Sequence, residues 1–270
     1  MEKIPTSVEK ILQFFQAQRQ DKIMQDDAWG IDTDRQDGDT QYWSNLFPYD
    51  RTFAPFLREF KTFGALALER KNQFGAASFL DLFGSGKFIA ETATPTAVLG
   101  IRNVDIMSQE ERQARPSWWQ IIEGNIFDLC NMPADLLLQI RDFLFAQKIE
   151  YFDFITCRPF GPFENYRSEY SKFSPEAYSY VYYLLLKQVS QFLSPNAGKL
   201  FTVLPEYNMD RSNFVVLVRY LKERGYKVRV SKTDSYYYEK KDTVMLIERS
   251  SQSVDLEQRP PFLTENSESI

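Results

Sequence analysis

The residues best suited to chemistry form an acid–glycine turn, in which Asp81 is followed by Gly84 and Gly86. The apolar run Ser78–Phe83 has the length and character of a buried strand, and the glycines predict a tight turn before a helix that begins at about Lys87. Glycine tolerates positive φ and lets a ligand approach the backbone, while the first turn of the next helix offers free N–H groups. The pattern is therefore typical of a nucleotide-binding site.

Spacing excludes two better-known glycine signatures. A phosphate-binding P-loop requires a glycine five residues before Gly86 and a serine or threonine after Lys87, and those places hold Asp81 and Phe88. A dinucleotide-binding fingerprint requires a third glycine where Ile89 stands. The turn therefore indicates a nucleotide site of another kind.

Composition limits the chemistry that can accompany this turn. The chain has no histidine, which excludes imidazole bases, His-dependent catalytic triads and the usual His-bearing metal sites, so we expect no metal. Its net charge of −5 gives no overall attraction for nucleic acid or for an anionic membrane. Cys130 and Cys157 are too few for a disulfide framework or a zinc site, which indicates a reducing, cytoplasmic setting. The amino terminus lacks an apolar run of signal-peptide or membrane-span length, and we expect a soluble protein.

Strands and helices alternate from about Ala76 to Ser250, and these elements must position the turn. Apolar runs predict further strands at 97–101, within 118–128, and at 151–157, 199–205, 226–230 and 243–249. Amphipathic spacing predicts helices at about 133–147, 174–192 and 212–225. No helix separates the last two strands. The order predicts a three-layer α/β domain with a mainly parallel sheet.

The flanking segments differ from this domain. Within residues 1–75 we expect a helix around 8–15, a solvated acidic loop at 26–40 that does not match a calcium loop, and a second helix at about 54–69. The apolar residues of that second helix have core spacing and are Phe56, Phe60, Phe63 and Leu66. We expect these N-terminal helices to cap the carboxyl edge of the sheet. Residues 251–270 are polar and proline-bearing, and we expect them to be disordered.

An acid that closes a buried strand before a glycine turn resembles the first motif of the Rossmann-like S-adenosylmethionine-dependent methyltransferases. The order of elements over 76–250 is similar to that family as well, including the two final strands. The resemblance implies a seven-stranded sheet with an antiparallel last strand, an N-terminal helical cap and S-adenosylmethionine as the cofactor. It also implies that Asp81, Gly84 and Gly86 hold the cofactor, because the family's glycines let its methionine part lie against the backbone.

The resemblance implies further cofactor-binding residues at the ends of the next strands. The family usually ends its second strand with an acid that accepts from the ribose hydroxyls, and here that place holds Arg102, with Asp105 three residues on. After the third strand, Ile126 stands where the family has an apolar residue on the adenine ring. Asn125 replaces the acid that takes the adenine amine; its amide oxygen can still accept from the amine, or Asp128 can be the partner instead. Cys157, at the end of the fourth strand, is the remaining cofactor-binding candidate.

We expect the methyl acceptor beyond strands four and five. Enzymes that methylate exocyclic amines of adenine carry an amide or acid there, and Arg158-Pro159-Phe160 has none, so we expect a small aromatic or acidic metabolite rather than nucleic acid. Arg158 can orient an anionic substrate, or it can simply pair with Asp153 or Glu164. Without histidine, the candidate bases are Glu164, Tyr166, Glu206 and Tyr207.

Two functions fit this pattern. The first is a methyltransferase that acts on a small molecule. The second is a methyltransferase-like binding or scaffolding protein without cofactor, because the glycine spacing, Arg102 and Asn125 depart from the family pattern and a fold can outlive its chemistry.

Overall fold

The computed structural model describes residues 49–82, 84, 86–102, 115–124, 126–130, 135–157, 175–204, 211–234 and 241–257. The strands in these ranges are β1 (Ser78–Leu82), β2 (Ala97–Arg102), β3 (Trp119–Glu123), β4 (Phe154–Cys157), β5 (Lys199–Leu204), β6 (Lys227–Asp234) and β7 (Lys241–Glu248). They form one seven-stranded sheet in the order β3-β2-β1-β4-β5-β7-β6. β7 runs antiparallel to β5 and β6, and the other neighbours are parallel. The predicted mainly parallel sheet with an antiparallel last strand is confirmed.

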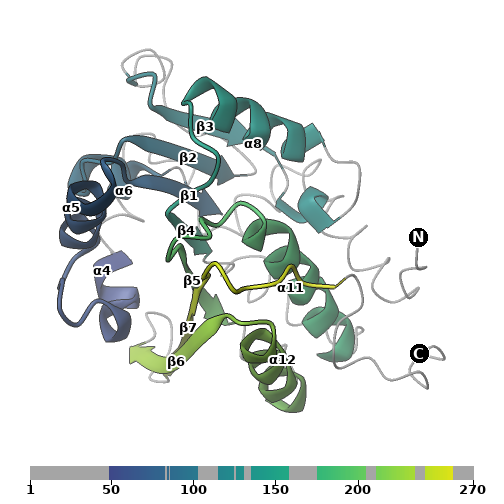
Figure 1. Ribbon diagram of the computed structural model, residues 1–270. Helices are drawn as coiled ribbons and strands as arrows, with labels where there is room; N and C mark the ends of the chain where they lie inside the picture. Colours follow the sequence, from purple (N-terminus) through teal and green to yellow (C-terminus); the bar gives the residue numbers. More distant parts are fainter. Residues whose placement is uncertain are drawn as a thin grey trace, which may run out of the picture.

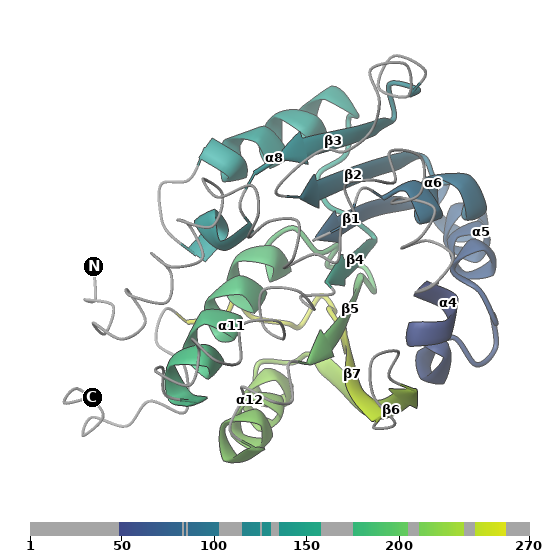
Figure 2. The ribbon, with the colours of Figure 1, turned by 180° about the vertical axis from the view of Figure 1, so that it is seen from behind.

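Helices lie on both faces of this sheet (Figures 1 and 2). One face carries α4 (Tyr49–Thr52), the short 3-10 helix η2 (Ala54–Phe56), α5 (Phe63–Phe74) and α6 (Lys87–Thr92). The other face carries α8 (Asp135–Ala146), α11 (Pro175–Ser190) and α12 (Arg211–Glu223), and the 3-10 helix η3 (Ile126–Cys130) follows β3. The predicted three-layer α/β architecture is therefore confirmed.

Alternation along β1 and β4 assigns their side chains to the two faces. Phe79 and Phe154 stack at 4.7 Å between ring centroids and belong to the core under α5 and α6. Ile155 belongs to the opposite core, under α8 and α11. Because side chains two residues apart share a face, Asp81 and Thr156 point to the same side as Phe79 and Phe154. This places the acid of the turn on the α5 and α6 side of the sheet.

The described part of the N-terminal segment before β1, residues 49–75, is called the lead-in and packs on a face of the sheet. The prediction that the N-terminal helices cap the carboxyl edge is therefore wrong for α5. Phe63 of α5 is fully buried, and its ring centroid lies 6.4 Å from that of Phe79 and 4.8 Å from that of Phe201. Large aromatic side chains bury more apolar surface against a sheet face than at its edge. Within the described part of this segment, α4 reaches the carboxyl edge through the Tyr49 hydroxyl, which donates to Asp81.

The predicted helix at 54–69 is divided in two. η2 ends at Phe56, and α5 begins only at Phe63, after Thr62 in an extended conformation. The Thr62 side chain accepts from the backbone N–H of Ala65, and Asp50 Oδ1 accepts from the N–H of Phe63 at 2.6 Å. Capping therefore starts a new helix there, although the apolar spacing continues through the break.

Residues 251–257 are ordered against the second helical layer, so the prediction of a disordered tail is wrong for this stretch. The side chain of Leu256 is buried in the core under α11 and α12. Asp255 pairs with Arg249 at 3.2 Å, and the backbone oxygen of Glu257 accepts from the Tyr183 hydroxyl at 2.6 Å. A single apolar side chain and a few polar contacts hold a segment whose composition is that of a linker.

Several expectations fall outside the described ranges, among them the helix around 8–15, the acidic loop at 26–40 and residues 258–270. No helix within those ranges combines the length and apolar character needed to cross a membrane.

Candidate functional site

The carboxyl ends of four neighbouring strands meet at one edge of the sheet. Leu82 at the end of β1 pairs in register with Ile101 of β2 and with Cys157 of β4. Arg102 at the end of β2 pairs with Glu123 at the end of β3. Open α/β sheets bind ligands beyond this edge, and the predicted site residues of known position lie along it.

Asp81 lies at the centre of a buried hydrogen-bond network. Its side chain is 1% exposed. Oδ1 accepts from the Tyr49 hydroxyl at 2.5 Å and from the Thr156 hydroxyl at 2.7 Å, and Oδ2 accepts from the backbone N–H of Gly86 at 2.9 Å. The carboxylate therefore joins α4, β4 and the glycine turn, and it holds the shape of the turn.

Gly84 and Gly86 are required by this packing. A Cβ on Gly84 would lie 2.1 Å from Oδ2 of Asp81, so the carboxylate rests directly on the backbone of the turn. Gly86 has a φ of 71°, and a Cβ there would lie 2.5 Å from Cγ1 of Val98. Gly84 also forms an isolated antiparallel bridge with Ile101, so the turn bends toward the end of β2. These contacts explain both glycines and their unusual spacing after Asp81.

The number of backbone donors available to a ligand is smaller than the sequence predicted. The N–H of Gly86 is donated to Oδ2 of Asp81, so it is not available to a ligand.

Cys157 faces away from the turn. Its side chain is fully buried in the core under α8 and α11. Burial is the main reason that its pKa rises to about 12, opposed by a hydrogen bond with Thr202. The thiol is therefore neutral and enclosed, and the role of Cys157 in cofactor binding stays a prediction.

The other predicted site residues are only partly placed. Arg102 is the last residue of β2, and Ile126 opens η3 just after β3, so both backbones lie at the expected strand ends. The remaining candidates lie outside the described residues and are Asp105, Asn125, Arg158, Glu164, Tyr166, Glu206 and Tyr207.

The suggested pairing of Arg158 with Asp153 is disfavoured. Asp153 precedes β4, at the edge opposite the end of the strand that Arg158 follows in the sequence. There its Oδ1 lies 2.6 Å from Nη2 of Arg70, and its Oδ2 accepts from the N–H of Ser78 at 2.9 Å. Asp153 therefore joins α5 to the beginnings of β1 and β4.

Sequence reasoning missed two residues of the network, Tyr49 and Thr156. Thr156 is a polar residue within a buried strand and lies in register with Asp81, which is a signal that strand pairing could have supplied. Tyr49 stands 32 residues before Asp81, and no spacing rule connects them.

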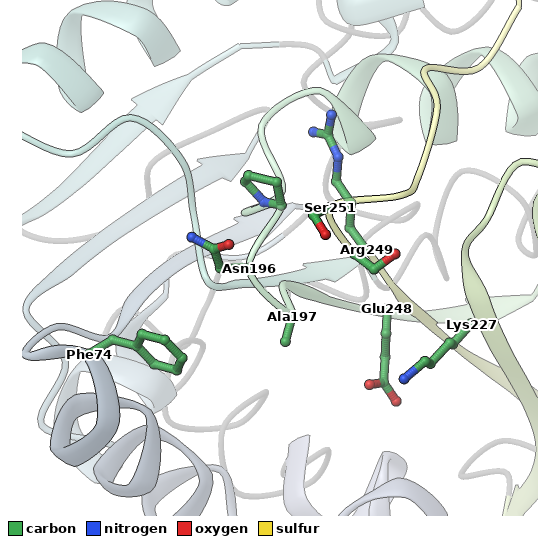
Figure 3. A pocket seen from close by; sticks show the side chains of 9 residues that line it. Phe74, Asn196, Ala197, Lys227, Glu248, Arg249 and Ser251 are labelled. Atoms are coloured by element: carbon green, nitrogen blue, oxygen red, sulfur yellow. The ribbon is translucent and has the colours of Figure 1, made fainter.

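A pocket of about 360 Å³ lies at the opposite edge of the sheet, where the parallel strands begin (Figure 3). Phe74, Asn196 and Lys227 line it together with residues that follow β7. Its carboxylate, Glu248, pairs with Lys199 at 3.8 Å and with Arg229 at 3.3 Å. Figure 3 shows the guanidinium of Arg249 turned away from Lys227 and Glu248, and it donates to the backbone oxygens of Ser190 and Leu193. These charged groups serve internal contacts, so the carboxyl edge is the better candidate site.

Within the part of the chain that the structure describes, no three His, Cys, Asp or Glu side chains group to hold a metal ion.

No protein-family model matches the chain, and no curated protein matches it in sequence. Solved structures with a similar fold include the N-methyltransferase NodS from Bradyrhizobium japonicum WM9 in complex with S-adenosyl-L-homocysteine, at 11% identity and a TM-score of 0.45, covering 83% of this chain and 99% of that chain. An O-methyltransferase from Bacillus cereus in complex with S-adenosylhomocysteine has 14% identity and a TM-score of 0.39, covering 78% of this chain and 96% of that chain. The DhpI complex with S-adenosylhomocysteine has 11% identity and a TM-score of 0.38, covering 90% and 97%. At such values the ligand and activity of this chain must be argued from its own residues.

Proposed function

We propose that the chain binds S-adenosylmethionine over Gly84 and Gly86 and transfers its methyl group to a small-molecule acceptor. The observation that carries this proposal is the combination of the Asp81 turn at the end of β1 with β7 inserted antiparallel between β5 and β6. In a dinucleotide-binding sheet, the sixth strand simply continues the parallel order. The antiparallel ending is what the methyltransferase resemblance implies.

The turn suits a ligand that needs close backbone approach rather than phosphate binding. Oδ2 of Asp81 accepts from the N–H of Gly86 and lies 2.1 Å from where a Cβ of Gly84 would be, so the backbone of the turn packs directly on the carboxylate. A phosphate would require several free N–H groups, and the N–H of Gly86 is already donated to Asp81. A nucleoside joined to a thioether or sulfonium chain carries no phosphate, so it needs fewer N–H donors at this turn than a pyrophosphate does.

The reaction needs positioning and one proton acceptor. A nucleophile on the acceptor attacks the methyl carbon, the carbon–sulfur bond breaks with its electron pair passing to sulfur, and S-adenosylhomocysteine leaves. A hydroxyl or amine nucleophile also gives up a proton to a base. We assign the base to a carboxylate or phenol among Glu164, Tyr166, Glu206 and Tyr207, because the chain has no histidine.

The acceptor we propose is small and carries an aromatic or acidic group. Arg158 follows β4 directly and supplies a planar set of donors for a carboxylate or a phosphate. The net charge of −5 disfavours a nucleic-acid substrate.

A binding or scaffolding protein without cofactor is the second candidate. The observation that favours it is Arg102, which ends β2 at the place of the ribose-binding acid. Such a protein would keep the sheet and the Asp81 network as structural elements alone.

Isothermal titration calorimetry with S-adenosylmethionine and S-adenosylhomocysteine separates these candidates. The proposal predicts saturable heat with both compounds at micromolar concentrations, while a Gly86→Arg variant that retains its circular dichroism spectrum gives none. If the wild-type protein gives no heat with either compound, the proposed function is wrong and the scaffold function is the candidate that remains.

Transfer of radiolabelled methyl to pooled small metabolites, RNA and protein extract then tests the acceptor class. We expect label in the small-molecule pool and a lower transfer rate in Arg158→Ala. Label in RNA or protein, with full activity in Arg158→Ala, contradicts the proposed acceptor.

A further inference from the structure

Tyr49 connects the N-terminal lead-in to the glycine turn. It belongs to α4, and its side chain is buried. Its ring stacks on Phe88 of α6, with centroids 5.4 Å apart, and meets Phe63 of α5 edge to face at 6.1 Å. Its hydroxyl donates to Oδ1 of Asp81 at the end of β1. One side chain therefore contacts three elements that surround the turn.

The carboxylate of Asp81 couples Tyr49 to the glycine turn, because Tyr49 and Gly86 both donate hydrogen bonds to it. Tyr49 and Thr156 both donate to Oδ1, which sets the rotation of the carboxylate and so directs Oδ2 at the N–H of Gly86. The same Oδ2 lies where a Cβ of Gly84 would be, so little space remains for the carboxylate to turn without moving the backbone. A buried acceptor that loses one donor is expected to reorient or to admit water.

We infer that Tyr49 is a positioning residue for the glycine turn, and that the turn adopts its ligand-binding shape only while α4 is docked on Phe63 and Phe88. The lead-in then controls the site without touching the ligand. This inference rests on the proposed function for the identity of the ligand, but its structural core, the coupling of Tyr49 to Gly86, does not.

Amide hydrogen exchange measured by NMR tests the coupling without any cofactor. Tyr49→Phe removes the hydroxyl and keeps the ring contacts with Phe63 and Phe88. We expect exchange of the Gly86 amide to accelerate about tenfold, the factor that loss of one hydrogen bond to a charged group gives. The amide of Val98, which donates to the backbone oxygen of Trp118, should keep its rate.

Tyr183→Phe is the matched control, because it also removes a buried tyrosine hydroxyl, here one that donates to the backbone oxygen of Glu257 on the other face of the sheet. It should leave the Gly86 amide unchanged. Wild-type exchange at Gly86 in Tyr49→Phe overturns the inference. Equal acceleration at Gly86 and Val98 also overturns it, because the effect would then be global stability.

Binding of S-adenosylhomocysteine supplies the second readout. We expect its dissociation constant to rise about tenfold in Tyr49→Phe and to stay within twofold in Tyr183→Phe. Equal affinity of Tyr49→Phe and the wild type contradicts a role in the site. If the wild-type protein binds no S-adenosylhomocysteine, the proposed function fails, and the exchange rates alone decide whether Tyr49 positions the turn.

Discussion

Gly84 makes the closest backbone approach in the turn. A Cβ there would lie 2.1 Å from Oδ2 of Asp81, and three donors hold that carboxylate in place. Gly84→Ala should therefore lower the free energy of unfolding by about 2 kcal/mol through overpacking. It should also weaken the binding of S-adenosylhomocysteine more than tenfold, as measured by urea denaturation and calorimetry.

Gly75→Ala is the control for this substitution. Gly75 ends α5 with a φ of 78°, and nothing lies within 4 Å of a Cβ built on it. We expect a loss of about 1 kcal/mol from the positive φ alone, with ligand affinity unchanged. Wild-type stability and affinity in Gly84→Ala would show that the turn tolerates a side chain.

Cys130 and Cys157 should be chemically silent in the native protein. Burial raises the pKa of both thiols, that of Cys157 to about 12, so at pH 8 both stay protonated. A thiol reagent such as 5,5′-dithiobis(2-nitrobenzoate) should modify neither in buffer and both in concentrated urea. Rapid modification of Cys157 in the folded protein would place its side chain in an open site and not in the core.

At this scale, the sequence identified the residues of the turn but not the residues that hold it. Asp81, Gly84 and Gly86 could be recognised because their roles follow from neighbours in the chain. Tyr49 could not, because its partner lies 32 residues away and becomes a neighbour only when α4 packs on the sheet. The cofactor and acceptor roles of all the predicted site residues, those of the turn included, stay predictions.

Among the elements, α5 is attached to the sheet by an ion pair as well as by its aromatic face. Nη2 of Arg70 lies 2.6 Å from Oδ1 of Asp153, and the two side chains are 10% and 12% exposed. Arg70→Ala leaves the Asp153 carboxylate buried without its cation, and should cost about 3 kcal/mol in urea denaturation.

Arg229→Ala tests the same kind of contact at the surface. Arg229 lies 3.3 Å from Glu248, but its side chain is 50% exposed, and we expect a loss below about 1 kcal/mol. Equal losses in the two variants would mean that α5 owes its position to Phe63 and its neighbours alone.

The helices show where periodicity is sufficient for prediction and where it is not. The helix predicted at about 133–147 is present as α8, and the amphipathic spacing corresponds to its buried residues Leu136, Leu137, Ile140, Phe143 and Leu144. The helix expected at 54–69 carries the same spacing but is interrupted, because Thr62 and Asp50 cap a new helix at Phe63. Side chains that hydrogen-bond to backbone N–H groups compete with the hydrogen bonds of a continuous helix, and the spacing of apolar residues gives no sign of this competition.

For the molecule as a whole, the number of strands could be predicted because each strand is an apolar run in the sequence. The strand directions could be predicted because strands and helices alternate along the chain, whereas the sequence predicts no helix between the last two runs. The placement of the lead-in on a sheet face could not, since its aromatic residues suit a cap or a core equally well. The same holds for residues 251–257, whose polar composition hides the anchoring role of Leu256.

The central claim is that the cofactor lies against Gly84 and Gly86 at the carboxyl edge of the sheet. A crystal structure of the protein with S-adenosylhomocysteine tests it most directly. We predict density for the methionine part of the ligand along the turn above Asp81, with Tyr49 still bonded to the carboxylate. Density in the pocket beside Phe74 and Lys227, or an empty carboxyl edge at saturating ligand, would contradict the claim.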